Sequence, residues 1–309
     1  MKKQEFYNWL VEYKNLSEQT AYLYTMSINR FYETIGPLES YSADEVYEHV
    51  VSLSRSASGH NSWVSSISRF EEFYAFGGQV FDWSSKLKNK PNDKRLPKPF
   101  TEEEIDKICG QIPINSLKGR RDRAIVELLY CGLRNQEVCS TTFDSLVDGT
   151  VLVFGKGAKE RYVPINDVAW NFILDYALLQ HGEAEELEAA GNYGLDYAFA
   201  RLKERLTDKT RCVFLTTAFN RMYPRAVRTL VYRHAEKAGV DNAHPHRFRH
   251  SFATHTLDGG LGNLTALKDV LGHTKFDMVQ KYVLTTKVGR ERVKSFHPRQ
   301  RREIERSDV

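Results

Sequence analysis

The sequence predicts a mainly α-helical protein with a small β-sheet, arranged in two domains. Its 309 residues exceed the length of most single compact domains. Apolar side chains recur at helical spacing through most of the chain, and capping-box patterns begin two helices, at Ser42 and at Thr101. Residues 151–165 instead read as two short apolar strands on either side of a Gly-Lys-Gly turn, which predicts a β-hairpin.

Residues 1–85 are predicted to form a small bundle of four helices. The third helix follows the capping box at Ser42. A loop of small polar residues is predicted over 52–62, and the fourth helix over 63–76, where two glycines end it. The apolar faces of the first two helices consist of Phe6, Trp9, Leu10, Tyr13, Tyr24, Ile28, Phe31 and Ile35.

Residues 101–286 are predicted to form the second domain. The stretch 182–211, rich in Glu and Ala, is predicted to be a helical excursion on the surface, and Cys212–Leu215 a short strand. A basic tail, residues 287–309, follows the domain. Helices are predicted at 120–132, 167–181, 222–238, 248–258, 263–271 and 276–283.

Residues 86–100 are predicted to be an extended linker between the domains, because prolines interrupt them. The linker carries six positive charges and one negative charge. Such a run is often only a solvated connector, but its place between two domains also suits contact with a phosphate backbone. The candidate DNA-binding residues of the linker are Lys88, Lys90, Lys94, Arg95 and Lys98.

The net charge of +4 is distributed unevenly along the chain. Residues 1–85 hold 6 Lys and Arg against 11 Asp and Glu, a net charge of −5, and the rest holds 38 against 29, a net charge of +9. The basic excess of the linker and C-terminal part favours a polyanionic partner, most simply nucleic acid. An ordinary solvated surface would give the same signal.

Targeting and metal-binding signals are absent from the sequence. No apolar run approaches the ~20 residues of a membrane span, and the N-terminus lacks the apolar core of a signal peptide. We therefore expect a cytoplasmic protein without a membrane partner. The four cysteines form no Cys-x-x-Cys pair and are expected to be reduced, and no ligand spacing predicts a zinc site.

Six polar residues together suit a phosphodiester substrate. Arginine clamps phosphate oxygens, histidine moves protons near neutral pH, and tyrosine can be a covalent nucleophile. Singly, each residue has an ordinary structural explanation. An arginine can cap a helix or pair with a carboxylate one turn later, as Glu137 would allow, and most tyrosines only pack. The candidates are Arg134, Lys156, His246, Arg249, His273 and Tyr282.

The spacing of these residues resembles that of the tyrosine recombinase (phage integrase) family, which includes Xer, Cre and phage integrases. The resemblance covers most of the chain, since Leu16–Thr20 and Phe31-Tyr32 are similar to the N-terminal domain of the family. The motifs that carry it in the second domain are Leu129–Glu137, Phe154–Ile165, Pro245–His255 and Leu271–His273 with Tyr282 nine residues later.

The resemblance implies a two-domain fold that closes on DNA as a C-shaped clamp. Residues 1–85 would be a SAM-like helical domain that binds the core DNA site, and residues 101–286 an α+β catalytic domain. The tail 287–309 is a candidate segment for exchange between subunits. Paired double-stranded DNA sites, a homotetramer on DNA formed from monomers, and an accessory DNA-bending or directionality factor are the expected partners.

The resemblance also implies a mechanism. Tyr282 would attack the scissile phosphorus and form a 3′-phosphotyrosyl link, and strands would exchange through a Holliday junction. Arg134 and Arg249 would neutralise the non-bridging oxygens, and Lys156 would protonate the departing 5′-oxygen.

The remaining groups would support this chemistry. His246 would assist the proton of the nucleophile, His273 would bond the phosphate, and Glu137 would support Arg134. Because these cations would take the place of a metal ion, neither a metal nor a cofactor is expected.

Other functions would also suit these residues. The same residues would serve a topoisomerase-like enzyme, and the fold would also suit a catalytically silent DNA-binding protein. A metal-dependent nuclease built on His244 and His246 lacks a nearby carboxylate cluster. Asn135-Gln136 and Val283-Leu284 depart from the family pattern and favour integration or excision of a mobile element, such as a phage, plasmid or transposon, over Xer-type dimer resolution.

Overall fold

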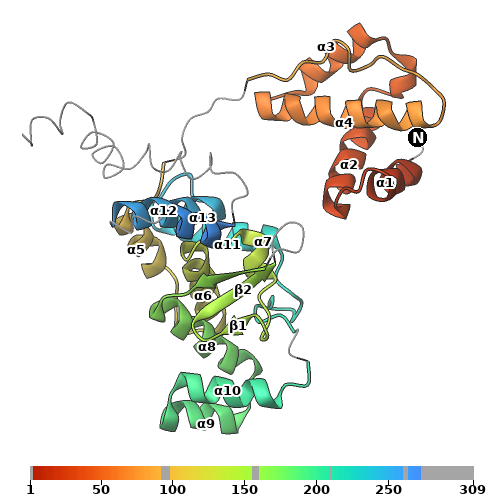
Figure 1. Cartoon of the computed structure of the whole chain (residues 1–309). Coiled ribbons are helices and arrows are strands. Elements are labelled where there is room, and N and C mark those ends of the chain that lie inside the picture. The colour runs from red at the N-terminus through yellow and green to blue at the C-terminus, as the bar shows by residue number, and fades with distance from the viewer. Residues whose placement is uncertain (1–2, 92–97, 155–159, 209–210, 260–263, 273–309) are drawn as a thin grey trace, which may run out of the picture. The chain divides into compact units, whose positions relative to one another are not determined.

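The computed structural model describes residues 3–91, 98–154, 160–208, 211–259 and 264–272 (Figure 1). The chain divides into two compact units, residues 1–95 and residues 96–309. Both are mainly helical, and the only sheet in the described ranges has three strands, which confirms the predicted fold class. Within those ranges, no helix is long and apolar enough to cross a membrane.

The first unit is a helical bundle. Its elements are α1 (Lys3–Glu12), α2 (Glu18–Thr34), the short 3-10 helix η1 (Leu38–Ser40), α3 (Ala43–Leu53) and α4 (Ala57–Phe76). The predicted capping box at Ser42 is present. The Ser42 side chain accepts a hydrogen bond from the backbone N–H of Glu45, and the Glu45 carboxylate accepts one from the backbone N–H of Ser42. Phe6, Ile28 and Phe31 lie in the core as predicted, but Tyr13 is exposed.

Helix α4 begins six residues earlier than predicted. Residues 57–62 are helical rather than a loop, because the Ser56 hydroxyl accepts a hydrogen bond from the Gly59 N–H and caps the helix there. Small polar residues look like a loop in the sequence, but they are tolerated in a helix that packs against others. The core of this unit is rich in aromatic rings that contact one another, including Phe81 stacked on Trp83, whose centroids lie 4.1 Å apart.

The second unit contains a continuous core formed by helices around a small sheet. Its helices are α5 (Glu102–Gly110), α6 (Leu117–Tyr130), α7 (Asn135–Cys139), α8 (Asp167–His181), α9 (Ala184–Tyr193), α10 (Leu195–Arg205), α11 (Pro224–Lys237), α12 (Pro245–Asp258) and α13 (Leu264–Leu271). The capping box at Thr101 is present as predicted. The central helix α6 is buried along most of its length.

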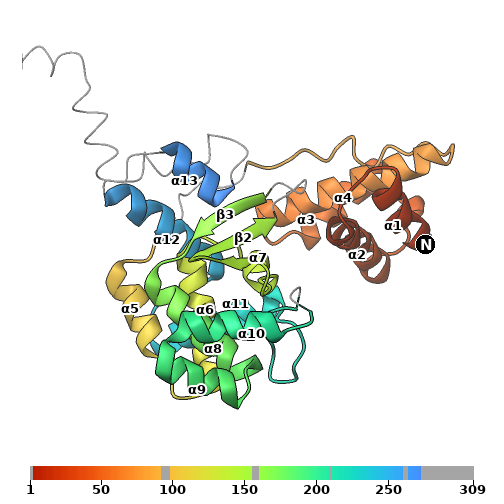
Figure 2. The ribbon, with the colours of Figure 1, turned by 60° about the horizontal axis from the view of Figure 1, so that its bottom comes forward.

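The sheet has the antiparallel order β1-β2-β3, formed by β1 (Leu146–Val147), β2 (Thr150–Phe154) and β3 (Glu160–Pro164). Strands β2 and β3 form the predicted hairpin, with Leu152 opposite Tyr162. Strand β1 was not predicted. The strand predicted at Cys212–Leu215 is wrong, because these residues form only isolated bridges, to Thr142 and Arg221. In Figure 2, α13 lies beside β3.

The stretch 182–211 is helical, as predicted, but it is not only a surface excursion. Helices α9 and α10 form a hairpin whose Ala189, Phe199 and Leu202 join the main core. The helix predicted at 276–283 and the tail 287–309 lie outside the described residues.

The two ends of the predicted linker are each held by their own unit. Asn61 on α4 bonds both the N–H and the carbonyl of Lys90, and His60 bonds the carbonyl of Lys88. In the second unit, Arg247 on α12 donates to the carbonyl of Lys98 at 3.0 Å. Lys94 and Arg95 lie outside the described residues.

Candidate active site

Arg134 is placed by a tight turn between two helices. Helix α6 ends at Tyr130, and Gly132 then adopts a φ of +93°, a conformation that favours glycine. A Cβ atom at Gly132 would also lie 2.8 Å from the ring of Phe252. The turn brings Arg134 to the N-cap of α7, where its side chain remains 38% exposed.

Glu137 is the acceptor at the centre of the site. Its carboxylate is 9% exposed and accepts from Arg134 twice, at 2.6 Å from the backbone N–H and 2.7 Å from Nη1. Nη2 of Arg161 on β3 donates to Oε2 at 2.7 Å, and Nη1 of Arg249 lies 3.8 Å from the same oxygen. Burial alone would raise the pKa of Glu137, but these hydrogen bonds and positive charges hold that pKa below its ordinary value.

Arg249 is a buried cation, with 1% of its surface exposed. It lies one turn into α12, and its Nη1 donates to the carbonyl of Gly132 at 2.5 Å. Its Nη2 donates to the carbonyl of Leu271. A planar guanidinium held at both ends by fixed carbonyls has little freedom to rotate, so its position is set before any substrate binds.

The C-terminal end of α13 completes the cluster. The carbonyls at the end of a helix lack intrahelical partners and carry a partial negative charge, so they attract cations. Here Arg161 Nε donates to Val270 at 2.9 Å, and Arg134 Nη2 donates to Leu271 at 3.1 Å and to Gly272 at 3.0 Å. Arginines from three separate elements therefore meet one carboxylate and one helix end.

His246 lies in the first turn of α12, three residues before Arg249. Partial enclosure by the protein, followed by the positive charge of Arg249, lowers the pKa of His246 below its ordinary value of 6.5. The charge of Arg134 acts in the same direction. The imidazole is therefore neutral at neutral pH and can accept a proton.

The structure brings together Arg134, Glu137, His246 and Arg249 from the residues that the sequence singled out. Lys156, His273 and Tyr282 lie outside the described residues. The chain segments that lead to them do converge, since β2 and β3 flank residues 155–159 and α13 leads to His273.

Metal ligation finds no support among the described residues, where no group of His, Cys, Asp and Glu side chains could hold an ion. His244, one of the two histidines considered for a nuclease, is the N-cap of α12. Its Nδ1 accepts a hydrogen bond from the backbone N–H of Arg247 at 3.1 Å. That nitrogen is thus engaged in capping the helix.

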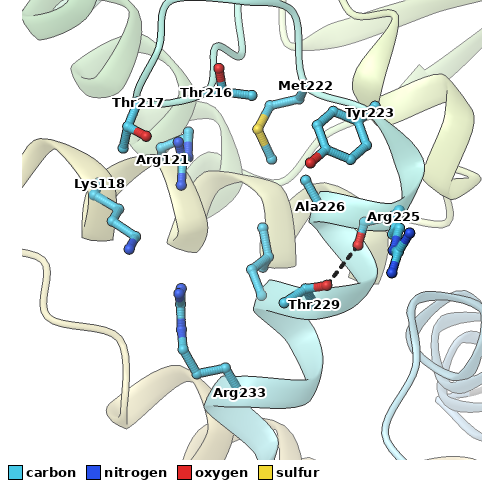
Figure 3. Close-up of a pocket in the computed structure, with 11 residues that line it drawn as sticks. Lys118, Arg121, Thr216, Thr217, Met222, Tyr223, Arg225, Ala226, Thr229 and Arg233 are labelled. Carbon is cyan, nitrogen blue, oxygen red and sulfur yellow. Dashed lines mark hydrogen bonds between the residues drawn. The ribbon is translucent and has the colours of Figure 1, made fainter.

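A second cluster of cations lines a cavity of about 300 Å³ between α6 and α11. Figure 3 shows Lys118 and Arg121 on the α6 side, and Arg225 and Arg233 along α11. The buried carboxylate of Asp122 pairs with Arg121 and Arg233, each at 2.7 Å, and fixes them. Three threonine hydroxyls also line this basic pocket, at Thr216, Thr217 and Thr229.

The sequence interpretation missed the basic pocket and the part that Arg161 takes in the arginine cluster. Arg161 stands in the quoted hairpin motif, but nothing in its spacing indicates a partner 24 residues away in the chain. The pocket cations are scattered among ordinary helix positions, and only the fold gathers them. Asn135 Nδ2 donates to the carbonyl of Pro224 at 2.9 Å, which links the residue after Arg134 to the residue before Arg225 of the pocket.

Comparison with known proteins agrees with this geometry. A profile of the phage integrase family matches residues 98–287, which include the whole arginine cluster. The chain belongs to the phage integrase family. Members of this family are tyrosine recombinases, enzymes that transfer DNA strands, and this chain is one of them.

Two curated relatives match over nearly the whole chain. The tyrosine recombinase XerA of Thermococcus kodakarensis is 31% identical over 287 residues, which cover 92% of this chain and 90% of that protein. The tyrosine recombinase XerD of Staphylococcus aureus is 27% identical over 312 residues, 96% of this chain and 98% of the relative. The similarity therefore extends beyond the catalytic unit.

Solved structures share the fold of this phage integrase family member. The site-specific recombinase XerH bound to difH substrate in a pre-cleavage complex has a TM-score of 0.61 at 18% identity, over 96% of this chain and 84% of that one. A lambda integrase tetramer bound to a Holliday junction has a TM-score of 0.62 at 16% identity, over 93% of this chain and 77% of that one.

Proposed function

We propose that this protein is a metal-independent site-specific recombinase in which Tyr282 cleaves DNA and forms a 3′-phosphotyrosyl intermediate. The observation that carries the proposal is the arginine cluster at the C-terminal end of α13. It lies at the point where the chain continues towards His273 and Tyr282. A nucleophile ten residues beyond Gly272 is within reach of a phosphate that the cluster binds.

The charges of the cluster suit a pentavalent phosphate transition state. Arg134 and Arg249 neutralise the non-bridging oxygens. Removal of one such contact from an active site typically costs ~3–4 kcal/mol of transition-state stabilisation. His246, neutral because its pKa is lowered, accepts or relays the proton of the tyrosine hydroxyl. Lys156 donates a proton to the departing 5′-oxygen, and His273 bonds the phosphate.

DNA is the partner of both units in this proposal. The basic pocket beside the arginine cluster suits further phosphates of the same duplex. The first unit binds the core site, the linker lysines follow the backbone, and the tail 287–309 docks on a neighbouring subunit. Solved relatives include a lambda integrase tetramer on a Holliday junction, which supports a tetramer as the strand-exchanging form.

The biological role has two candidates. The departures at Asn135-Gln136 and Val283-Leu284 favour integration or excision of a mobile element. The curated relatives that span most of the chain, XerA and XerD, favour the Xer-type role, which is resolution of chromosome or plasmid dimers. Conversion of plasmid dimers to monomers at a chromosomal site of the host would support the second role, and retention of the dimers the first.

Covalent trapping tests the chemical proposal. The full-length protein and its Tyr282→Phe variant are incubated, in EDTA, with nicked duplexes carrying sites from the source genome, and adducts are separated on a denaturing gel. We expect an adduct with the wild type alone. An adduct that persists in the variant would place the nucleophile elsewhere, and no adduct on DNA that the protein binds would favour a silent DNA-binding protein.

A further inference from the structure

Arg161 has a place in the active site that the resemblance does not assign. We propose that Arg161 is a positioning residue that holds Glu137 away from Arg249 and so keeps the arginine pair available to the phosphate. This inference rests on the proposed function, because it concerns the same phosphate. Arg161 lies on β3, and its side chain is 10% exposed.

The contacts of Arg161 show how it would act. Its Nη2 donates to Oε2 of Glu137 at 2.7 Å, and this oxygen already accepts the backbone N–H of Arg134 at 2.6 Å. Oε2 is also the oxygen closest to Arg249, whose Nη1 remains 3.8 Å from it. Arg161 therefore occupies the acceptor that Arg249 would otherwise take.

A second contact fixes the guanidinium in place. Arg161 Nε donates to the carbonyl of Val270 at 2.9 Å. Gly272, with a φ of +59°, packs against the same group, since a Cβ atom there would lie 3.1 Å from its Cδ, Nε and Cζ atoms. Lysine has only one donor group and could not reach both the carboxylate and the carbonyl with this geometry.

The electrostatic consequence is a surplus of positive charge. Three guanidinium groups around one carboxylate leave a formal charge of +2 for the phosphate. Without Arg161 the surplus falls to +1, and the Glu137 carboxylate can turn to Arg249. The loss should therefore slow the step in which charge develops on the phosphate more than it weakens DNA affinity.

A neutral substrate separates this role from a structural one. The scissile phosphate of the nicked duplex is replaced by a methylphosphonate, which lacks one charged non-bridging oxygen and needs less neutralisation. Single-turnover adduct formation is then measured on both duplexes for the full-length wild type, Arg161→Gln and Arg161→Lys. Arg205→Gln is the matched control, because Arg205 also bonds a carbonyl and carboxylates, those of His181, Glu183 and Glu186, in the α9–α10 hairpin.

We expect Arg161→Gln to slow cleavage of the phosphodiester on the order of 10²-fold, with a much smaller defect on the methylphosphonate and nearly unchanged DNA affinity. Arg161→Lys should lie between the wild type and Arg161→Gln. An equal loss on both duplexes, or no loss on either, would overturn the inference. Failure of the wild type to form a Tyr282-dependent adduct would instead overturn the proposed function.

Discussion

Arg134 and Arg249 donate hydrogen bonds to the same acceptor, the carbonyl oxygen of Leu271 at the end of α13. The two residues lie 115 positions apart in the chain, and one atom sets the distance between their guanidinium groups. Each arginine is fixed again on its other side, Arg134 by Glu137 and Arg249 by Gly132. The separation of the two cations is thus established by the folded chain before substrate binds, which is the preorganisation that electrostatic catalysis requires.

Replacement of Arg249 by lysine should abolish most of the cleavage activity and leave DNA binding nearly intact. Lysine keeps the charge but cannot bridge the carbonyls of Gly132 and Leu271. We expect single-turnover cleavage to fall by roughly 10²–10³-fold. Fluorescence anisotropy with labelled duplex measures the affinity in parallel. An activity within a few-fold of wild type would show that the two-sided anchoring is unnecessary.

Glu137→Gln should destabilise the second unit by about 3–5 kcal/mol, because it leaves buried arginines without their carboxylate. Since the pKa of Glu137 is depressed in the folded state, its contribution is present above the ordinary carboxyl value of 4.5 and is lost as the pH falls through the lower folded value. Urea unfolding of the wild type and Glu137→Gln at several pH values should show a difference in the free energy of unfolding that becomes smaller only at acidic pH.

A control separates stability from activity in this comparison. Glu186 is also buried, and hydrogen bonds from the backbone N–H of Glu183 and from Arg205 likewise hold its pKa below the ordinary value, but it lies in the α9–α10 hairpin. Glu186→Gln should destabilise the protein without slowing cleavage at a temperature where it is folded. If Glu137→Gln also left cleavage unchanged, the carboxylate would only support the fold.

Protonation of His246 should set the pH at which the cleavage rate falls in acid. Enclosure and the charges of Arg249 and Arg134 lower its pKa, so the neutral form that accepts a proton persists below pH 6.5. Single-turnover rates should therefore decline with a midpoint below 6.5, and His246→Gln should lack this step. A midpoint above 6.5 in the wild type would contradict the lowered pKa.

Local signals predicted much of the fold. The capping boxes at Ser42 and Thr101 and the hairpin over residues 151–165 depend on neighbouring residues, and the structure confirms all three. The start of α4 was missed because Ser56 caps a helix whose first turns are polar. The prediction of a strand at Cys212–Leu215 was wrong, because this apolar run has no adjacent partner strand and forms only isolated bridges.

The parts of the candidate site that belong to a local sequence motif could be predicted. The parts that the fold brings together from distant segments could not. The pairing of Arg134 with Glu137 follows from their spacing of three residues at the start of α7, and it is found at 2.7 Å. The contacts of Arg161 with Glu137 and Val270 join segments that are distant in sequence, so no local pattern could indicate them.

The basic pocket should contribute to DNA affinity and not to chemistry. The side chains of Lys118 and Arg225 line it, and neither side chain makes a hydrogen bond or ion pair within the part of the chain that the structure describes. Each substitution by glutamine should weaken DNA binding and reduce the slope of log affinity against log salt by about 1. Lys237→Gln, at the far end of α11, is the control. An unchanged salt slope would place the pocket outside the DNA interface.

The attachment of residues 98–100 to α12 sets the boundary of any catalytic fragment. Phe100 is fully buried against Phe248, its N–H donates to the Ser251 hydroxyl at 2.7 Å, and Arg247 lies 3.9 Å above its ring. A fragment that begins at Thr101 would leave a hole beside the helix that carries His246 and Arg249. For expression of this unit alone, the first residue should therefore precede Lys98.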